Sequence, residues 1–220
     1  MQRIVRYLVA RTYKPLLVRY LSRTRTYAYR GITVEVPPDV FHPGCFFSTR
    51  FLLRYLDRIN VAGKTFLELG AGSGLISLAA YRRGATVMAT DINPVAIEFL
   101  QRNADLNHAS LVIRRADLFT GIEKQSFDII AINPPYYRKD PTTHLDHAWY
   151  CGAGGTFFAR LFAQIGPYLH AHSVVLMVLC DGCDLHMING FAIENGLSMK
   201  LLHQRMNLVE TNSIFQIMQG

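Results

Sequence analysis

The first 34 residues of this 220-residue chain contain no acidic residue, although they include eight basic ones. The remaining 186 residues hold 15 basic and 16 acidic residues, so that part of the chain is close to neutral. The net charge of +7 therefore comes from the start of the chain. It suggests an acidic partner such as nucleic acid, the ribosome or an anionic membrane surface.

Long apolar runs are absent as well. The longest candidate for deep burial, Val174 to Cys180, has seven residues, whereas a membrane-spanning helix needs about 20. Arg6 and Arg11 interrupt the apolar start of the chain, so the core of a signal peptide is lacking. We therefore expect a cytoplasmic protein, neither secreted nor membrane-spanning. An organellar transit peptide is the alternative interpretation of the arginine-rich start.

Cysteine and charge are both scarce. Four cysteines in 220 residues are ordinary for a cytosolic protein and too few for a disulfide scaffold. Charged residues make up 18% of the chain and hydrophobic residues 50%, so the chain has enough apolar material for a packed core. Cys180 and Cys183 have CxxC spacing, for which a structural turn with two thiols is favoured over a redox site.

Residues 1–60 are predicted to form a basic N-terminal arm and a lead-in helix, ahead of one domain at 61–220. Apolar residues recur at helical spacing in the arm, where Pro15 starts a second helix or kinks the first, and we expect them to pack on the domain. These positions are Ile4, Val5, Leu8, Val9, Leu16, Leu17, Tyr20 and Leu21. The arginines would then face solvent. A short strand is expected at 33–36 and the lead-in helix at 51–59.

From residue 65 onwards, short apolar runs alternate with helical patterns. The runs predict strands at 65–69, 86–90, 111–115, 127–132 and 174–180, and a final hairpin of 199–206 with 214–218. Helices are predicted from the glycine loop to 83 and at 94–106, 156–169 and 184–195. The pattern indicates an α/β fold: a Rossmann-like, doubly wound, mostly parallel sheet with a C-terminal antiparallel hairpin. Such sheets bind ligands beyond the carboxyl ends of their strands.

A glycine-rich loop, Glu68 to Gly74, follows the first of these strands. Its spacing is G-x-G-x-G, and glycines there let the backbone turn tightly and approach a ligand closely. The dinucleotide fingerprint G-x-G-x-x-G would need glycine where Leu75 stands, so a nicotinamide cofactor is disfavoured.

Single acidic residues follow the next two strands. Asp91 can accept hydrogen bonds from both hydroxyls of a ribose. The alternative, a charge on a helix N-terminus, is less favoured because Asn93 already suits the cap. Asp117 either accepts a hydrogen bond from an adenine amino group or is a surface acid.

Asn133-Pro134-Pro135-Tyr136 directly follows the predicted buried strand that ends at Ile132. The two prolines fix the backbone and aim its carbonyl groups, Asn133 adds an acceptor, and Tyr136 supplies a stacking face. This combination suits a planar NH2 group, whose hydrogens two acceptors can hold. Because its lone pair is conjugated, such a nitrogen attacks poorly, and holding both N–H bonds biases it towards a pyramidal, attacking geometry.

Taken in order, these four features resemble the motifs of class I S-adenosylmethionine-dependent methyltransferases of the amino-methylating NPPY group. The strongest resemblance is to the small-methyltransferase and release-factor glutamine methyltransferase families. It covers about residues 40–180, and includes the segment 47–53 and the glycine-rich stretch 152–155. The resemblance implies S-adenosyl-L-methionine as cofactor, no metal, and transfer by in-line displacement, in which the protein acts by positioning and electrostatics.

The resemblance also implies a role for each matching residue. Cofactor binding falls to Thr49, Glu68, Gly70, Ala71, Gly72, Asp91, Ile92, Asp117, Leu118 and Asn133. Catalysis falls to Asn133, Pro134, Pro135 and Tyr136. Within the second group, Asn133 and the Pro134 carbonyl would hold the acceptor nitrogen and Tyr136 would stack on it.

The predicted function is S-adenosylmethionine-dependent N-methylation of a planar amide or base nitrogen of a macromolecule, either protein glutamine or an RNA or DNA base. The alternatives are a small-molecule methyltransferase and a non-catalytic module that binds RNA or membrane through its basic arm. The bacterial glutamine enzymes carry a helical N-terminal domain that recognises the release factor. Here about 60 residues precede the glycine loop, which puts that substrate in doubt.

His144 and His147, with Asp146 between them, lie in the segment after the NPPY motif. Three interpretations are open: a plain surface loop, a loop that gates the substrate, and a metal site, which would need further ligands. The surface loop is favoured among them.

Overall fold

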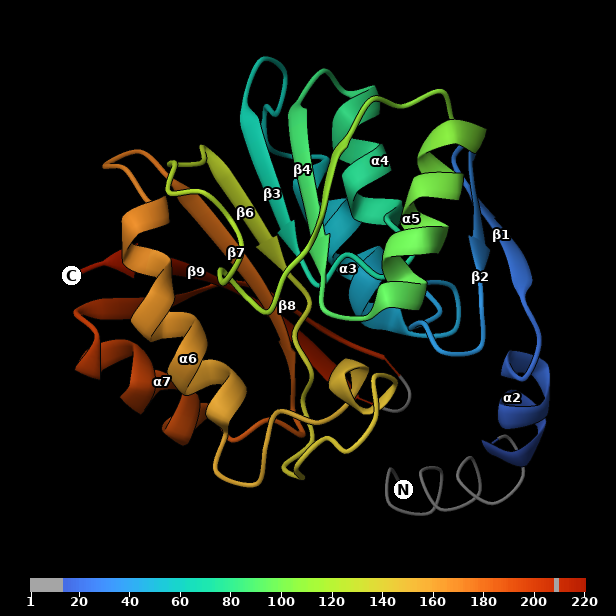
Figure 1. Cartoon of the computed structure of the whole chain (residues 1–220). Helices are drawn as coiled ribbons and strands as arrows, with labels where there is room; N and C mark the ends of the chain where they lie inside the picture. The colour runs from blue at the N-terminus through green and yellow to red at the C-terminus, as the bar shows by residue number, and fades with distance from the viewer. Residues whose placement is uncertain (1–13, 208–209) are drawn as a thin grey trace.

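The computed structural model describes residues 14–207 and 210–220, and its central feature is a seven-stranded sheet (Figure 1). The strand order is β5-β4-β3-β6-β7-β9-β8. The first five of these strands are parallel, whereas β9 runs antiparallel to β7 and β8 antiparallel to β9. The strands are β3 (Thr65–Leu69), β4 (Thr86–Asp91), β5 (Val112–Arg115), β6 (Ile129–Ile132), β7 (Val174–Cys180), β8 (Leu197–Met206) and β9 (Thr211–Gln219). The predicted fold class is confirmed.

Helices cover both faces of the sheet (Figure 1). One face packs against α3 (Phe47–Leu56), α4 (Leu75–Arg82) and α5 (Pro94–Leu106), and the other against α6 (Thr156–Ile165) and α7 (Leu185–Glu194). In β6, Ile129 and Ala131 face the first set of helices, while Ile130 and Ile132 face the second. Since side chains alternate between faces, a strand covered on both sides must be apolar throughout, as the sequence predicted.

Side chains cap two helices, and the cap of α5 is the predicted one. Asn93 caps α5 by accepting a hydrogen bond from the Val95 N–H at 3.0 Å, with Pro94 at the first helical position. Asp184 caps α7 by accepting from the Met187 N–H at 3.1 Å. In contrast, α3 begins at Phe47 rather than near residue 51, and its N-cap residue makes no side-chain cap bond. The sequence therefore held no local signal for that start.

A two-stranded hairpin precedes α3 and packs beside α5 (Figure 1). Its strands are β1 (Arg25–Tyr29) and β2 (Ile32–Val36), of which only the second was predicted. Side chains of β2 are buried in the same core as α3 and α4. The proposed boundary between arm and domain near residue 60 stays a prediction.

Asn103 of α5 and Asn107, the C-cap residue of that helix, lie one turn apart and fix the position of β2. Asn103 accepts from the Glu35 N–H at 2.7 Å and donates to the Glu35 carbonyl at 2.9 Å. Asn107 pairs with Thr33 in the same way, at 3.1 and 2.7 Å. The two side-chain amides thus imitate a neighbouring strand and satisfy backbone groups that would otherwise lack partners. Because residues 37–46 continue directly from β2, these bonds also set where that segment starts.

The basic arm is described only from residue 14 onwards, so the predicted apolar positions Ile4 to Val9 lie outside the described residues. Helix α2 (Lys14–Leu21) agrees with a helix starting near Pro15. The prediction that its apolar residues pack on the domain is wrong for Leu16 and Tyr20, which are 68% and 43% exposed. Within the described ranges, no helix is both long and apolar enough to cross a membrane.

Candidate active site

A cleft lies beyond the carboxyl ends of β3, β4, β5 and β6, where the strand order reverses. It encloses about 1120 Å³, its open mouth included. Loops after these four strands form the walls, together with residues from 39–49 and 144–148. The predicted residues that line it are Thr49, Glu68, Gly70, Ala71, Gly72, Asp91, Ile92, Asp117, Leu118, Asn133, Pro134, Pro135 and Tyr136. The structure thus brings every predicted site residue to one cleft, while their individual roles stay predictions.

The glycine loop gives the cleft an open backbone wall. Gly70, Gly72 and Gly74 all have positive φ, at +72°, +54° and +79°. A Cβ atom on Gly70 would meet nothing within 4 Å, so the backbone there is accessible to a ligand. A Cβ atom on Gly74, the N-cap of α4, would lie 2.2 Å from Leu100 Cδ1. A side chain at position 74 would therefore have to displace the end of Leu100, and the positive φ also favours glycine there.

Glu68, in β3, is a buried carboxyl group that also lines the cleft. Its Oε2 accepts hydrogen bonds from the Ser77 N–H at 2.8 Å and from the Ser77 hydroxyl. Burial raises the pKa of Glu68 to about 8; the bonds from Ser77 oppose this rise and the negative charge of Asp91 adds to it. Glu68 is therefore largely protonated at neutral pH, so it can donate a hydrogen bond as well as accept one.

This raised pKa predicts how stability depends on pH. Between its ordinary value near 4.5 and about 8, folded Glu68 holds a proton that the unfolded chain has released. The free energy of unfolding of the ligand-free chain should therefore fall by about 1–4 kcal/mol as the pH rises from about 5 to about 8. Urea unfolding across this range measures the slope. Glu68→Gln should flatten it, and an equal slope in both proteins would contradict the assignment.

Asp91, at the end of β4, is oriented by two backbone groups. Its Oδ2 accepts from the Gly72 N–H at 2.8 Å and its Oδ1 from the Asn93 N–H at 2.9 Å. Burial raises the pKa of Asp91, and these bonds limit that rise. Each carboxylate oxygen keeps a further lone pair. Asp91 therefore faces the cleft as a fixed double acceptor.

Asp117 and Leu118 follow β5. The Asp117 carboxylate forms an ion pair with Arg160 of α6, with 2.8 Å between Oδ2 and Nη2, and both side chains are about half exposed. Leu118 has a φ of +53°, which turns the backbone so that the Thr120 N–H donates to the Asp117 carbonyl at 3.0 Å. Among the described residues Asp117 Oδ1 has no bonding partner, so one carboxylate oxygen is left to accept a hydrogen bond.

The amide of Asn133 is oriented by two neighbours in the NPPY loop and α3. Its Nδ2 donates to Thr49 Oγ1 at 3.3 Å, and the Tyr136 hydroxyl donates to its Oδ1 at 2.7 Å. Oδ1 keeps a second lone pair for a substrate N–H. In the described parts of the chain, nothing donates to the carbonyl oxygens of Pro134 and Pro135. The loop thus presents acceptors, and Tyr136 orients one of them.

The backbone after the motif is held by the segment 149–152. The N–H groups of Tyr136 and Tyr137 both donate to the Trp149 carbonyl, at 3.1 and 2.9 Å, and the Cys151 N–H donates to the Tyr137 carbonyl at 2.9 Å. These bonds add to the rigidity that the two prolines impose. A rigid loop can keep its acceptors aimed at one point, which is the condition for catalysis by positioning.

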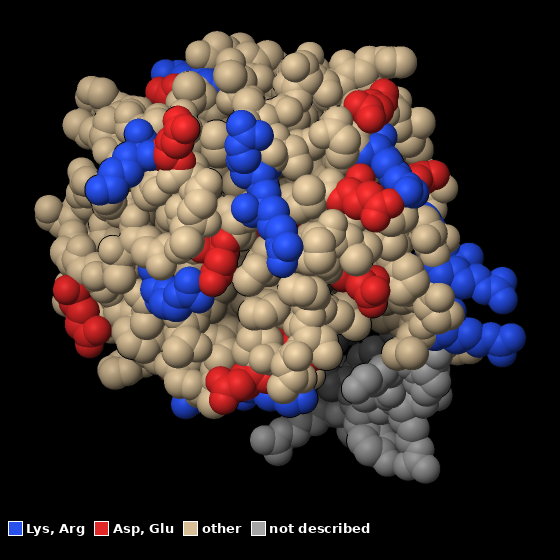
Figure 2. All heavy atoms as spheres, viewed as in Figure 1, with Lys and Arg blue, Asp and Glu red and all other residues tan. Residues whose placement is uncertain are grey.

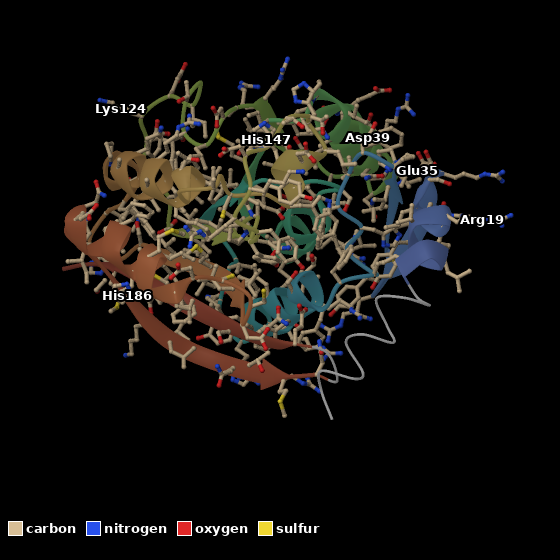
Figure 3. The ribbon with its side chains drawn as sticks, turned by 90° about the horizontal axis from the view of Figure 1, so that it is seen from below. Arg19, Glu35, Asp39, Lys124, His147 and His186 are labelled. Atoms are coloured by element: carbon tan, nitrogen blue, oxygen red, sulfur yellow. The ribbon has the colours of Figure 1, made fainter. Side chains whose placement is uncertain are left out.

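An aromatic cluster joins the segment before α3 to the segment that ends at Trp149, and both segments border the mouth of the cleft. The ring of Phe46 lies 4.5 Å from that of Phe41 and 4.9 Å from that of Trp149, centre to centre. His144 and His147 are both exposed and border the cleft from the segment 144–148, so the surface-loop and substrate-gating interpretations both stay predictions (Figure 3 labels His147). No group of three or more metal-ligating side chains occurs among the residues described.

Several residues that line the cleft were not predicted from the sequence. Asp39, Phe41 and Pro43 lie in the segment after β2, and Phe157 lies in α6. They belong to no motif, and their only sequence cue is that the first three stand just before the segment 47–53.

Cys180 and Cys183 form the predicted turn at the end of β7. The Cys183 N–H donates to the Cys180 carbonyl at 3.0 Å, and the two sulfur atoms are 3.9 Å apart. Both are free thiols. The shared S–H···S contact lowers the pKa of Cys180 and raises that of Cys183.

The family model of the methyltransferase small domain matches residues 31–153. The chain belongs to the methyltransferase small domain family. The matched segment begins in the β1–β2 turn and extends through the NPPY motif, so it contains the whole series of motifs around the cleft. The predicted resemblance to this family is confirmed.

The names of relatives of this methyltransferase small domain specify different methyl acceptors. A provisionally named protein N5-glutamine methyltransferase of Methanocaldococcus jannaschii is 37% identical over 53% of this chain and 57% of its own length. A tRNA1(Val) (adenine(37)-N6)-methyltransferase of a Flavobacteriaceae bacterium is 32% identical over 54% of this chain and 51% of its own. The chain thus spans about half the length of the curated relatives it matches.

Solved structures share the fold of this methyltransferase small domain. A methyltransferase from Pyrococcus furiosus has a TM-score of 0.65 at 20% identity, covering 95% of this chain and 98% of that one. The E. cuniculi Mtq2–Trm112 complex, described as responsible for methylation of the eRF1 termination factor, has a TM-score of 0.64 at 24% identity, covering 83% and 99%. A T. thermophilus 16S rRNA N2 G1207 methyltransferase in complex with AdoMet and guanosine has a TM-score of 0.63 at 20% identity, covering 90% and 50%.

Proposed function

We propose that this protein is an S-adenosyl-L-methionine-dependent N-methyltransferase that acts on a planar amide or base nitrogen of a macromolecule. The observation that carries the proposal is the Asn133 amide, oriented by Tyr136 and Thr49 beside two proline carbonyls that have no donor in the described chain. No lysine or arginine is among the described residues that line the cleft, so these acceptors suit a neutral NH2 group rather than a carboxylate or phosphate.

The residues around the cleft fit the cofactor. When bound, S-adenosyl-L-methionine supplies a methyl group on a cationic sulfur. Asp91 offers a fixed pair of acceptors for ribose hydroxyls, and Gly70 leaves open space beside its backbone, where a side chain would intrude. Asp117 Oδ1 would accept from the adenine amino group. The further residues proposed to bind the cofactor are Thr49, Glu68, Ala71, Gly72, Ile92, Leu118 and Asn133.

The rest of the mechanism concerns the acceptor nitrogen. Asn133 Oδ1 and the Pro134 carbonyl would accept its two N–H hydrogens, and Tyr136 would cover the attached planar group. Because both N–H bonds are then directed towards the protein, the nitrogen lone pair is left facing the methyl donor. The aromatic cluster of Phe41, Phe46 and Trp149 would shield this point from water at the mouth of the cleft.

Transfer of labelled methyl groups into cell extract tests the proposal. We expect label in a macromolecular fraction, which protease removes if the acceptor is a protein and nuclease removes if it is RNA or DNA. The names of the relatives include both acceptor classes. Label only in a filterable fraction would indicate a small-molecule methyltransferase. No label in any fraction, despite measurable cofactor binding, would favour a non-catalytic module.

A further inference from the structure

Two thiols lie in contact at the carboxyl end of β7. Cys180 is the last residue of that strand, and its sulfur atom is 3.9 Å from that of Cys183. The Cys183 N–H donates to the Cys180 carbonyl at 3.0 Å, which closes residues 180–183 into a turn, here called the thiol turn. Such a turn keeps its first and last Cα atoms within about 7 Å, and disulfides span about 4.4–6.8 Å between Cα atoms. The backbone of the thiol turn is therefore compatible with a disulfide.

The thiol turn is open to solvent, and its two thiols differ. Asp181 and Gly182 are exposed, Cys183 is half-buried and Cys180 is 6% exposed. The hydrogen bond from the Cys183 thiol lowers the pKa of Cys180; burial opposes this effect and the Gly182 N–H supports it. The thiolate, rather than the thiol, attacks an oxidant. Cys180 is therefore the thiol that reacts first, and its low exposure suits a small oxidant such as a hydroperoxide.

The thiol turn lies next to the NPPY loop. Strands β6 and β7 are parallel neighbours with Ile132 opposite Met177, so the chain leaves both strands at the same edge of the sheet (Figure 1). Burial raises the pKa of Tyr136 well above its usual value, and negative charge on Cys180 and Cys183 adds to the rise. The tyrosine whose hydroxyl orients the acceptor amide is thus buried close to both sulfur atoms.

An ion pair joins the thiol turn to the backbone after the NPPY motif. Acidic and basic side chains adjoin at several places on the face seen in Figure 2. Arg138 and Asp184 connect these two segments, with 3.2 Å between Nη1 and Oδ2. Near its start the turn is held by β9, since the Asp181 N–H donates to the Thr211 carbonyl at 2.9 Å. Closing the turn further would therefore move its second half together with the segment after the motif.

We propose that Cys180 and Cys183 form a reversible disulfide that displaces the NPPY loop and slows methyl transfer. The Cys180 thiolate attacks a hydroperoxide, here hydrogen peroxide, whose O–O bond breaks to give a sulfenic acid and hydroxide. The Cys183 thiol then attacks the sulfenic sulfur, so the S–S bond forms and the sulfenic oxygen leaves as water with the Cys183 proton. Hydroxide takes up the proton that Cys180 had released. Two thiols are thus oxidised to a disulfide while one peroxide is reduced to two water molecules.

Peptide mapping of the full chain after treatment with hydrogen peroxide tests for the disulfide. Cys180 and Cys183 fall in one tryptic peptide, 161–200, whereas Cys151 falls in 140–160 and Cys45 in 31–50. After free thiols are blocked, we expect peptide 161–200 to be unblocked and lighter by two hydrogen atoms, and dithiothreitol to restore both thiols. Two blocked thiols in this peptide, added oxygen atoms in place of a disulfide, or a link to Cys151 would overturn the proposal.

Transfer rate and cofactor affinity, measured on the reduced and the oxidised protein, test the effect on the site. The disulfide depends only on the thiol turn, whereas this effect rests on the proposed function. Because a displacement of about 1 Å can cost about 100-fold in rate, we expect oxidation to slow transfer about 10- to 100-fold. The affinity for S-adenosylmethionine should stay within about threefold, since β3 and β6 separate β7 from β4, which carries Asp91. Equal transfer rates in the two states would overturn the switch.

Fluorescence of Trp149 gives a second measurement that needs no acceptor. It is the only tryptophan in the sequence, and its carbonyl accepts the N–H groups of Tyr136 and Tyr137. Its emission should change on oxidation and return with dithiothreitol, and unchanged emission in a protein that carries the disulfide would contradict a displaced loop. If the reduced protein transfers no methyl group, the proposed function fails, and the peptide map and this emission still decide whether the disulfide forms and moves the loop.

Cys183→Ser and Cys180→Ala each remove one sulfur of the pair, and Cys45→Ser is the matched control at another half-buried thiol. Reduced Cys183→Ser should transfer at the rate of the unchanged protein, and neither pair variant should respond to peroxide. Cys45→Ser should respond like the unchanged protein. Thermal unfolding by circular dichroism checks that all three variants fold. A peroxide response that the pair variants keep, or that Cys45→Ser loses, would overturn the proposal.

Discussion

Replacing Asn133 with alanine should lower methyl transfer about 10²–10³-fold while changing the affinity for S-adenosylmethionine by no more than about threefold. The amide is the acceptor that would hold the substrate nitrogen, and alanine removes it at a point that the Trp149 segment keeps rigid. Transfer of labelled methyl groups at saturating cofactor gives the rate, and isothermal titration gives the affinity.

Tyr136→Phe is the variant to compare with Asn133→Ala. It keeps the aromatic ring but removes the hydroxyl that donates to Asn133 Oδ1 at 2.7 Å. Because the amide loses one of its two orienting contacts and not its acceptor, we expect a loss of about tenfold in transfer rate. A rate in Asn133→Ala equal to that of the unchanged protein would show that the NPPY loop does not hold the acceptor.

Replacing Asp91 with asparagine should weaken S-adenosylmethionine binding about 100-fold. The Asp91 carboxylate accepts the N–H groups of Gly72 and Asn93, one on each oxygen. An asparagine has one acceptor oxygen, so its NH2 group would face one of these N–H donors. The substitution therefore removes an acceptor for ribose and disturbs the glycine loop together, and each loss costs about 1–2 kcal/mol. Isothermal titration measures the change.

Asp117→Asn provides a comparison at the other end of the proposed nucleoside site. Its carboxylate is about half exposed and already paired with Arg160, so removing its charge should weaken binding only about threefold. Glu123→Gln, at an exposed position outside the cleft, should have no effect. Equal losses from Asp91→Asn and Asp117→Asn would contradict the assignment of Asp91 to the ribose.

Local signals explain which elements could be predicted. The helix from Pro94 to Leu106 agrees with the sequence because Asn93 and Pro94 specify its start through neighbouring residues alone. Strand β1 was missed because Arg25–Tyr29 alternates between half-buried and exposed residues and so lacks an apolar pattern. Its partner β2 is local, across the turn at 30–31, but the amides that position β2, those of Asn103 and Asn107, are about 70 residues away. The start of α3 was missed because its N-cap makes no side-chain cap bond.

In the candidate active site, too, the features that follow a local sequence pattern could be predicted, and those that depend on distant residues could not. The motif residues meet because each follows a parallel strand, and parallel strands bring their carboxyl ends to one edge of the sheet. The aromatic cluster could not be predicted, since Phe41 and Trp149 are about a hundred residues apart and belong to no motif. Similarly, nothing in the sequence showed that Ser77 would bond to Glu68, or that Tyr136 would orient Asn133 through its hydroxyl.

Mass-spectrometric localisation of the transferred methyl group tests the central claim most directly. The full chain is incubated with labelled S-adenosylmethionine and cell extract, and the labelled product is digested and fragmented to find the atom that carries the methyl group. The acceptors in the NPPY loop predict a planar nitrogen, either a side-chain amide or the amino group of a base. A methyl group on carbon, oxygen or sulfur would contradict the account.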